Sequence, residues 1–161
     1  MEVIFAPWRM EYITRGDLEE GCLFCRVLSE ENDRENLLLF RGGLVSVVMN
    51  RYPYANGHLM VFPNRHTGNI EEMTSKEASD LFRFVSHCVK ILKKVVSPSG
   101  FNIGMNIGRS AGAGVVDHLH IHIVPRWDGD TNFMPVVSST KIISEALEAT
   151  YDKLLPQFKR L

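Results

Sequence analysis

Residues 117–127 read DHLHIHIVPRW, and polar and apolar residues alternate strictly from His118 to Ile123. Alternation with a period of two is typical of a β-strand with one buried face. Because residues i, i+2 and i+4 of a strand share a face, the histidines would line one face and the apolar residues would face the core. The three rings, His118, His120 and His122, would then lie about 6–7 Å apart in succession.

Three histidines on one strand face need an explanation, because Thr or a Lys/Glu pair is the ordinary choice for a solvated face. An ordinary half-buried strand is therefore a poor interpretation. A single metal ion does not readily take all three rings, since the outer two would lie about 13 Å apart. The rings should therefore have different roles. Imidazole can act as nucleophile, proton carrier, phosphate partner or metal ligand near neutral pH.

Around this stretch, short apolar runs separated by turn residues predict four further strands. The strands expected are residues 37–40, 44–49, 58–62 and 101–107, with 119–124 as the fifth. Short turns rather than helical crossovers join most of them, which favours an antiparallel sheet with helices packed against it. The fold class expected from the residues is therefore α+β.

Two helices are expected beside the sheet. Thr74 and Glu77 have the spacing of a capping box, apolar residues recur at helical spacing after them, and Pro98 closes the segment. A second apolar series indicates a C-terminal helical segment within residues 136–161, which Pro156 would kink or end.

The composition predicts one globular domain over residues 1–161, with residues 1–20 as an irregular N-terminal extension. The chain is 45% hydrophobic, which is enough to bury a core. Its formal net charge of -1 argues against a protein that binds nucleic acid mainly by electrostatics. No apolar run approaches the ~20 residues of a membrane span, and no signal peptide is visible. Three cysteines exclude a disulfide scaffold and, with the missing signal, favour the cytoplasm.

Two further motifs carry chemistry. Residues 22–25 form a Cys-x-x-Cys pair, which alone is compatible with redox activity, metal binding or no special function. A thioredoxin-like role expects a βαβ pattern, which the sequence lacks. Residues 108–114 form a small-residue loop, which is either a flexible hairpin or a place where backbone N–H groups approach phosphates. The loop lacks the Lys-Ser/Thr of a P-loop.

The histidine stretch resembles the signature of the histidine triad (HIT) superfamily, His-φ-His-φ-His-φ-φ, without a gap over residues 118–124. The resemblance extends over about residues 20–135. Residues 58–66 are similar to the family's upstream histidine strand, and residues 106–108 are similar to its Asn-x-Gly segment. Four further segments are similar in particular to the diadenosine tetraphosphate phosphorylase and fragile histidine triad branch: residues 7–12, 22–25, 111–118 and 127–133. The resemblance implies a HIT-like fold, with a sheet of about five strands, a central helix and a C-terminal helix.

The resemblance also implies the catalytic residues. His120, the middle histidine, would attack the α-phosphorus of a nucleotide and form a nucleotidyl-histidine intermediate. The phosphate-binding residues expected are His58, Asn106, Gly112, Gly114 and His122. Many family members carry Gln-Ser or Gln-Thr shortly before the first histidine, where this chain has Gly114 and Val115. This chain therefore lacks a side-chain donor to the leaving group. Its absence argues against phosphoramidate hydrolysis and favours an acceptor preference like that of a phosphorylase.

A nucleoside site and a metal site complete the expectation. By the resemblance Asn50 would contact a ribose, whereas Phe24 and Val47 would either flank the base or simply pack in the core. In related branches, including galactose-1-phosphate uridylyltransferase, equivalent residues form a Cys₂His₂ site, so we expect structural zinc. The ligands would be Cys22, Cys25, His66 and His118. In the alternative, the cysteines are merely buried and His66 caps the turn that follows it.

The function expected is that of a nucleotidyl transferase or hydrolase that acts on dinucleoside polyphosphates or related adenine nucleotides. The acceptor would be phosphate in a phosphorylase and water in a hydrolase of dinucleoside polyphosphates or nucleoside phosphoramidates. A nucleotide-sensing protein with weak turnover is an alternative. A metal-dependent regulator built around the Cys-x-x-Cys is another, but it leaves His58, His120 and His122 unexplained. A homodimer is expected by resemblance alone.

Overall fold

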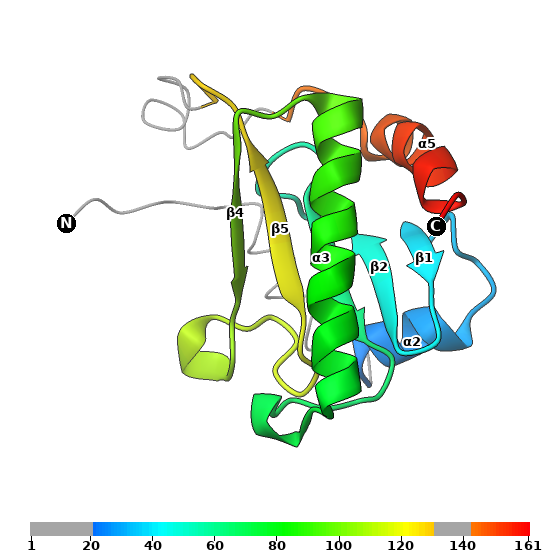
Figure 1. Cartoon of the computed structure of the whole chain (residues 1–161), viewed down its shortest axis with the longest axis vertical. Helices are drawn as coiled ribbons and strands as arrows, with labels where there is room; N and C mark the ends of the chain where they lie inside the picture. The colour runs from blue at the N-terminus through cyan, green and yellow to red at the C-terminus, as the bar shows by residue number, and fades with distance from the viewer. Residues whose placement is uncertain (1–20, 131–142) are drawn as a thin grey trace.

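The computed structural model describes residues 21–130 and 143–161, so the expected N-terminal extension lies outside the described residues. Five strands form one antiparallel sheet in the order β1-β2-β3-β5-β4, and the expected α+β fold with about five strands is confirmed (Figure 1). The strands are β1 (Leu38–Arg41), β2 (Val45–Met49), β3 (Leu59–Pro63), β4 (Gly100–Met105) and β5 (Ile121–Arg126).

Three helices accompany the sheet within the described residues. The long helix α3 (Ser75–Val96) lies across one face, and α5 (Leu147–Phe158) packs beside α3 and β1 (Figure 1). The short helix α2 (Leu23–Ser29) and two 3-10 turns, η1 (Ile70–Glu72) and η2 (Arg109–Ala111), complete the described elements. None of the described helices combines the length and apolar character that a membrane crossing requires.

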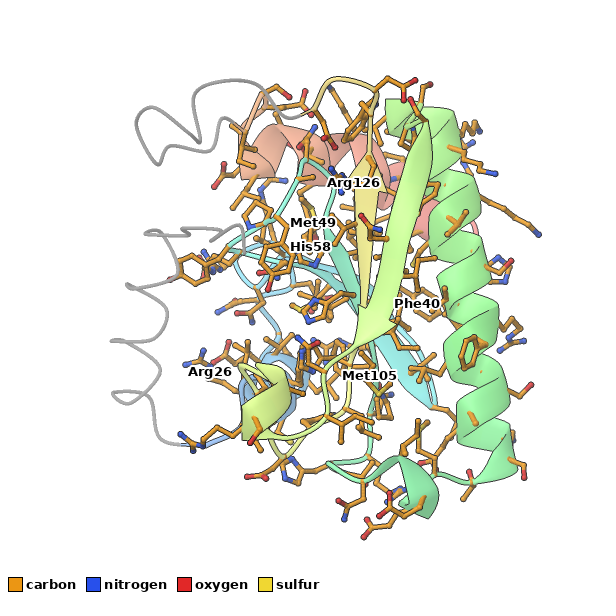
Figure 2. The ribbon with its side chains drawn as sticks, turned by 90° about the vertical axis from the view of Figure 1, so that its left-hand side faces the viewer. Arg26, Phe40, Met49, His58, Met105 and Arg126 are labelled. Carbon is orange, nitrogen blue, oxygen red and sulfur yellow. The ribbon has the colours of Figure 1, made fainter. Side chains whose placement is uncertain are left out.

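Both faces of the central strands are covered. Phe62 of β3 stacks on Phe24 of α2 with ring centroids 4.4 Å apart, so this side of β3 faces α2 and the other faces α3. Met60 points to the same side as Phe62, and its cross-strand partner is His122 of β5. The side chain of His122 therefore lies on the sheet face away from α3. Figure 2 shows His58 on that side as well.

The loop between β2 and β3 is held tightly at its end. Gly57 has a φ of 71°, and a Cβ there would lie 3.1 Å from the Leu92 side chain of α3. The left-handed backbone and the close approach both favour glycine. Asn56 accepts a hydrogen bond from the buried Thr150 of α5 at 2.8 Å. These contacts fix the place at which His58 enters the sheet.

Helix α3 begins at the capping box expected from the sequence. Glu77 N–H donates to Thr74 Oγ1 at 3.2 Å, and Thr74 N–H donates to the Glu77 carboxylate at 2.8 Å. Arg65 donates to both oxygens of the same carboxylate, at 2.8 and 3.0 Å. The hydrogen bonds from Arg65 and then from Thr74 lower the pKa of Glu77 to about 2.

Replacing Glu77 by alanine is expected to lower the free energy of unfolding by about 2 kcal/mol near neutral pH. Because the folded-state pKa is depressed, this stabilisation is present above the ordinary value of 4.5 and is lost as the pH falls toward 2. Urea denaturation near neutral pH and at about pH 3.5 measures both effects, with Glu71→Ala on η1 as the matched control. A Glu77→Ala deficit of the same size at both pH values would contradict this account.

Candidate active site

A cavity of about 750 Å³ opens on the sheet face that lies away from α3. Its walls come from α2, the loop after β2, β3, the η2 loop and the segment that leads into β5. The histidines that line it are His66, His120 and His122. Figure 2 shows Arg26, another lining residue, on the same side of the sheet as His58. The volume is typical of sites for small molecules and cofactors.

The hydrogen bonding of His120 decides which of its ring nitrogens is available. The residue is 3% exposed, and its Nδ1 lies 2.9 Å from the His118 carbonyl oxygen. Because a carbonyl only accepts, we assign the proton to Nδ1 and the lone pair to Nε2. Burial lowers the pKa of His120, so the ring is neutral near pH 7. An unprotonated Nε2 is the form that nucleophilic attack requires.

The strand expected over residues 119–124 begins later, because β5 starts at Ile121. Pro63 ends β3 and has no N–H for the ladder, and its carbonyl accepts from His118 Nε2–H at 2.7 Å. The first two histidines therefore lie in the irregular segment before the strand. The expected row of evenly spaced rings on one strand face is wrong: His118 is fully buried, and the other two ring centroids lie 4.8 Å apart.

His58 lies behind His122. It is fully buried, its Nδ1 accepts from Tyr54 N–H at 3.1 Å, and its Nε2 lies 3.0 Å from His122 Nδ1. Because Nδ1 accepts, we assign the His58 proton to Nε2, which donates to His122. A neutral His122 then carries its own proton on Nε2. Both ring nitrogens of His58 are engaged within the fold, which favours a role in orienting His122. The direct phosphate contact expected of His58 stays a prediction.

These hydrogen bonds predict the ring tautomers, which nitrogen NMR distinguishes. At about pH 8, where unperturbed histidines are neutral, His120 should carry its proton on Nδ1, whereas His58, His118 and His122 should carry it on Nε2. In the variant His58→Phe, only His122 should lose its fixed tautomer. The half-buried His87 of α3 is the reference ring. A wild-type His120 protonated on Nε2 would contradict the assignment.

The loop at residues 108–114 borders the cavity through Gly112 and Gly114. Gly112 ends η2 in the left-handed conformation, with a φ of 83°. Asn106 Nδ2 donates to the Gly112 carbonyl at 3.5 Å, so the amide side chain ties the two ends of the loop together. Of the expected phosphate-binding residues in this region, the two glycines lie at the cavity and Asn106 lies beside them, outside its lining.

Two of the three residues expected around a nucleoside line the cavity. Asn50 Oδ1 accepts from Tyr52 N–H at 2.9 Å, which leaves the Asn50 amide nitrogen as the donor. Phe24 packs against the His120 ring with centroids 5.0 Å apart. Val47 is fully buried in the core and does not belong to the lining, so it takes the packing role that was its alternative.

The residues Cys22, Cys25, His66 and His118 form a cluster that could hold a metal ion. Their four ligand atoms all lie within 4.8 Å of one another. Cys22 is the N-cap residue of α2 and Cys25 lies in the first turn of this helix, which the sequence did not predict. A redox pair also suits a helix start, but the strands of the described sheet pair antiparallel, so the βαβ unit of a thioredoxin-like site is absent there.

The geometry of this cluster fits a tetrahedral ion. Because His118 Nε2–H donates to Pro63, the His118 Nδ1 lone pair faces the thiols, 3.1 Å from Cys22 Sγ and 3.7 Å from Cys25 Sγ. His66 Nδ1 lies 3.3 Å from Cys25 Sγ. Zinc with bonds of about 2.3 Å to sulfur and 2.0 Å to nitrogen would give sulfur–nitrogen edges of about 3.5 Å. The observed separations are close to that value.

Several parts of the site carried little or no signal in the sequence. The Tyr54 N–H and the Pro63 carbonyl are backbone groups, which any suitably folded segment can offer. Arg109 also lines the cavity, and its signal was its place as the one charged residue within residues 108–114. The resembling segment at residues 7–12 lies outside the described residues.

Comparison with known proteins agrees with this geometry. A family model, the HIT domain, matches residues 31–129. A Mycobacterium tuberculosis protein named AP-4-A phosphorylase is 35% identical over 99% of this chain and 86% of its own length. An asymmetrical bis(5'-nucleosyl)-tetraphosphatase of Schizosaccharomyces pombe is 36% identical over 58% of this chain and 50% of its own. A hypothetical histidine triad nucleotide-binding protein of Sulfolobus tokodaii superposes with a TM-score of 0.69 at 27% identity, over 87% of this chain and 93% of that one.

Proposed function

This chain belongs to the histidine triad (HIT) family, and on that premise we propose that it is a nucleotidyl transferase that cleaves dinucleoside polyphosphates through a covalent nucleotidyl-His120 intermediate. The observation that carries the proposal is the buried, neutral His120 ring, whose Nδ1–H is held by the His118 carbonyl while the ring borders the cavity. Binding alone would not require an unprotonated nucleophile at this place.

In the first step, the His120 Nε2 lone pair forms a bond to the α-phosphorus, and the bond from that phosphorus to its bridging oxygen breaks. The electron pair leaves with the polyphosphate half of the substrate. The ring needs no prior loss of a proton, because Nε2 is already unprotonated. The nucleotidyl-imidazolium that forms is positively charged, and its Nδ1–H remains bonded to the His118 carbonyl, which stabilises that charge.

The remaining groups stabilise the transferred phosphoryl. Phosphoryl transfer depends on positioning and on electrostatic stabilisation of the non-bridging oxygens. The Nε2–H of His122 and the backbone N–H groups near Gly112 and Gly114 are the donors proposed for this role. His58 acts as a positioning residue, because its Nε2–H fixes the orientation and the tautomer of His122.

In the second step, an acceptor oxygen attacks the same phosphorus, the phosphorus–Nε2 bond breaks, and neutral His120 is restored. We propose inorganic phosphate as this acceptor, so that diadenosine tetraphosphate would yield ATP and ADP. Support comes from the relative named AP-4-A phosphorylase and from Gly114 and Val115, which place no hydroxyl donor before the triad. Water is the alternative acceptor, which the relative named as a tetraphosphatase favours.

Incubation with diadenosine tetraphosphate, with and without inorganic phosphate, tests this proposal. With phosphate, equal amounts of ATP and ADP are expected; without it, cleavage should stop after a single turnover. Cleavage at the full rate without phosphate would replace the phosphorylase with a hydrolase. Binding of the nucleotide without cleavage in either condition would overturn the enzyme in favour of a nucleotide-sensing protein.

We further propose that the Cys22, Cys25, His66 and His118 cluster holds zinc, because two thiolates and two imidazoles are a usual closed ligand set for that ion. Zinc bound there would have a structural role, because it would compensate the negative charges of the two thiolates. The four residues would join α2 to the segment that precedes β5. The expected homodimer and cytoplasmic location stay predictions.

A further inference from the structure

The cavity has two ends with the catalytic histidines between them. At one end lies α2, whose Phe24 packs against the His120 ring, and at the other lies the η2 loop with Gly112. The loop that begins at Asn50 borders the cavity beside His122, where Tyr54 contacts the His122 ring. Figure 1 shows α2 and the yellow-green η2 turn on opposite sides of the lower end of β5. A dinucleoside polyphosphate also has two halves, one on each side of the phosphorus under attack. The two ends of the cavity can therefore receive different parts of one substrate.

Arg109 is the cationic group at the η2 end. It starts η2, its side chain is exposed, and it borders the same cavity as Gly112, Gly114 and His122. Two other described arginines line the cavity from other elements: Arg26 is on α2, and Arg51 follows Asn50 and donates to the Glu35 carbonyl. Among the described residues, Arg109 is therefore the arginine that the glycine loop itself carries.

We propose that Arg109 binds the phosphates beyond the one that His120 attacks, and thereby makes the enzyme selective for long polyphosphate chains. This inference rests on the proposed function and deepens it. The transferred nucleotidyl group would lie against Phe24 and Asn50, and the departing nucleoside polyphosphate would lie along the η2 loop.

Charge supports the assignment. The departing half of a dinucleoside tetraphosphate carries three phosphates, and its negative charge rises when the bridging bond breaks. A guanidinium forms short, bidentate, charge-assisted hydrogen bonds with phosphate oxygens. The whole chain has a formal net charge of only -1, so attraction of such an anion must come from local groups. The loop offers no hydroxyl at Gly114 or Val115, which leaves Arg109 as its strongest side-chain donor.

The variant Arg109→Gln tests this inference, with kcat/KM for diadenosine tetraphosphate as one readout and the inhibition constant of AMP as the other. AMP carries the α-phosphate but no further phosphates. We expect kcat/KM to fall by about 10- to 100-fold, as for a lost charge-assisted hydrogen bond, while the AMP constant stays within about twofold. Arg83→Gln is the matched control, because Arg83 lies on α3 and does not line this cavity.

Two results would overturn the role of Arg109. One is an unchanged kcat/KM in Arg109→Gln, and the other is an equal loss in both readouts, which would indicate a general disturbance of the site. Because the side chain is exposed, thermal denaturation of the variant should match that of the wild type. Failure of the proposed function is distinguishable, since a wild-type protein that does not cleave diadenosine tetraphosphate would show it before any variant is made.

Discussion

Replacing His120 by alanine is expected to lower kcat for diadenosine tetraphosphate by about 10⁴-fold or more. The variant has no nitrogen that can attack the phosphorus, and the groups that remain can only bind and polarise the substrate. The dissociation constant for the same nucleotide should change by less than about tenfold, or ~1.4 kcal/mol. Steady-state kinetics and calorimetric titration measure the two quantities separately.

His87→Ala is the control for this experiment, because His87 is a half-buried histidine on α3 that does not line the cavity. It should leave both quantities unchanged. Because His120 is buried, His120→Gln, which keeps most of the side-chain volume, guards against a folding defect in the alanine variant. Normal turnover by either His120 variant would contradict the assignment of the nucleophile.

Replacing Cys22 by serine is expected to remove about one zinc ion per chain and to lower the free energy of unfolding by about 3 kcal/mol or more. Cys22 Sγ lies 3.1 Å from His118 Nδ1, so a metal at this cluster ties α2 to the residue that precedes the nucleophile by two positions. Turnover should fall as well, since the His118 carbonyl holds the His120 Nδ1–H. Metal analysis of protein purified without added metal, followed by thermal denaturation, measures the first two effects.

Cys88→Ala provides the matched control for the metal site. Cys88 is fully buried on α3, and burial raises the pKa of its thiol far above the ordinary value, so it is a poor metal ligand. Its replacement should cost only about 1 kcal/mol and leave the zinc content unchanged. Less than about 0.3 zinc per chain in the wild type would contradict the stoichiometric site.

Sequence patterns predicted the parts of the fold that depend on local periodicity and end signals. The strands of the sheet followed from short apolar runs, and the start of α3 followed from Thr74 and Glu77. The start of β5 was misplaced because the alternation at residues 118–123 is also compatible with a segment outside the ladder. Only the partner strand decides between the two, and here it ends at Pro63. Helix α2 was missed because its seven residues are too few for a clear helical period.

The chemistry of the candidate site was harder to predict from the sequence than its residue types. Histidine spacing pointed to different roles for the rings, but the assignment of each ring depends on which nitrogen is protonated. Those protons are set by backbone groups, the His118 and Pro63 carbonyls and the Tyr54 N–H, whose positions follow from tertiary packing. For the same reason, the sequence predicted a phosphate contact for His58. In the structure the His58 side chain is buried and lies behind His122.

The covalent intermediate is the central claim, and intact-protein mass spectrometry tests it most directly. Wild-type protein mixed with diadenosine tetraphosphate in the absence of phosphate and quenched rapidly should gain the mass of one adenylyl group, and peptide mapping should place that group on His120. The adduct should disappear when phosphate is added and should be absent from His120→Ala. Cleavage of the substrate with no adduct, or with the adenylyl group on another residue, would contradict the account.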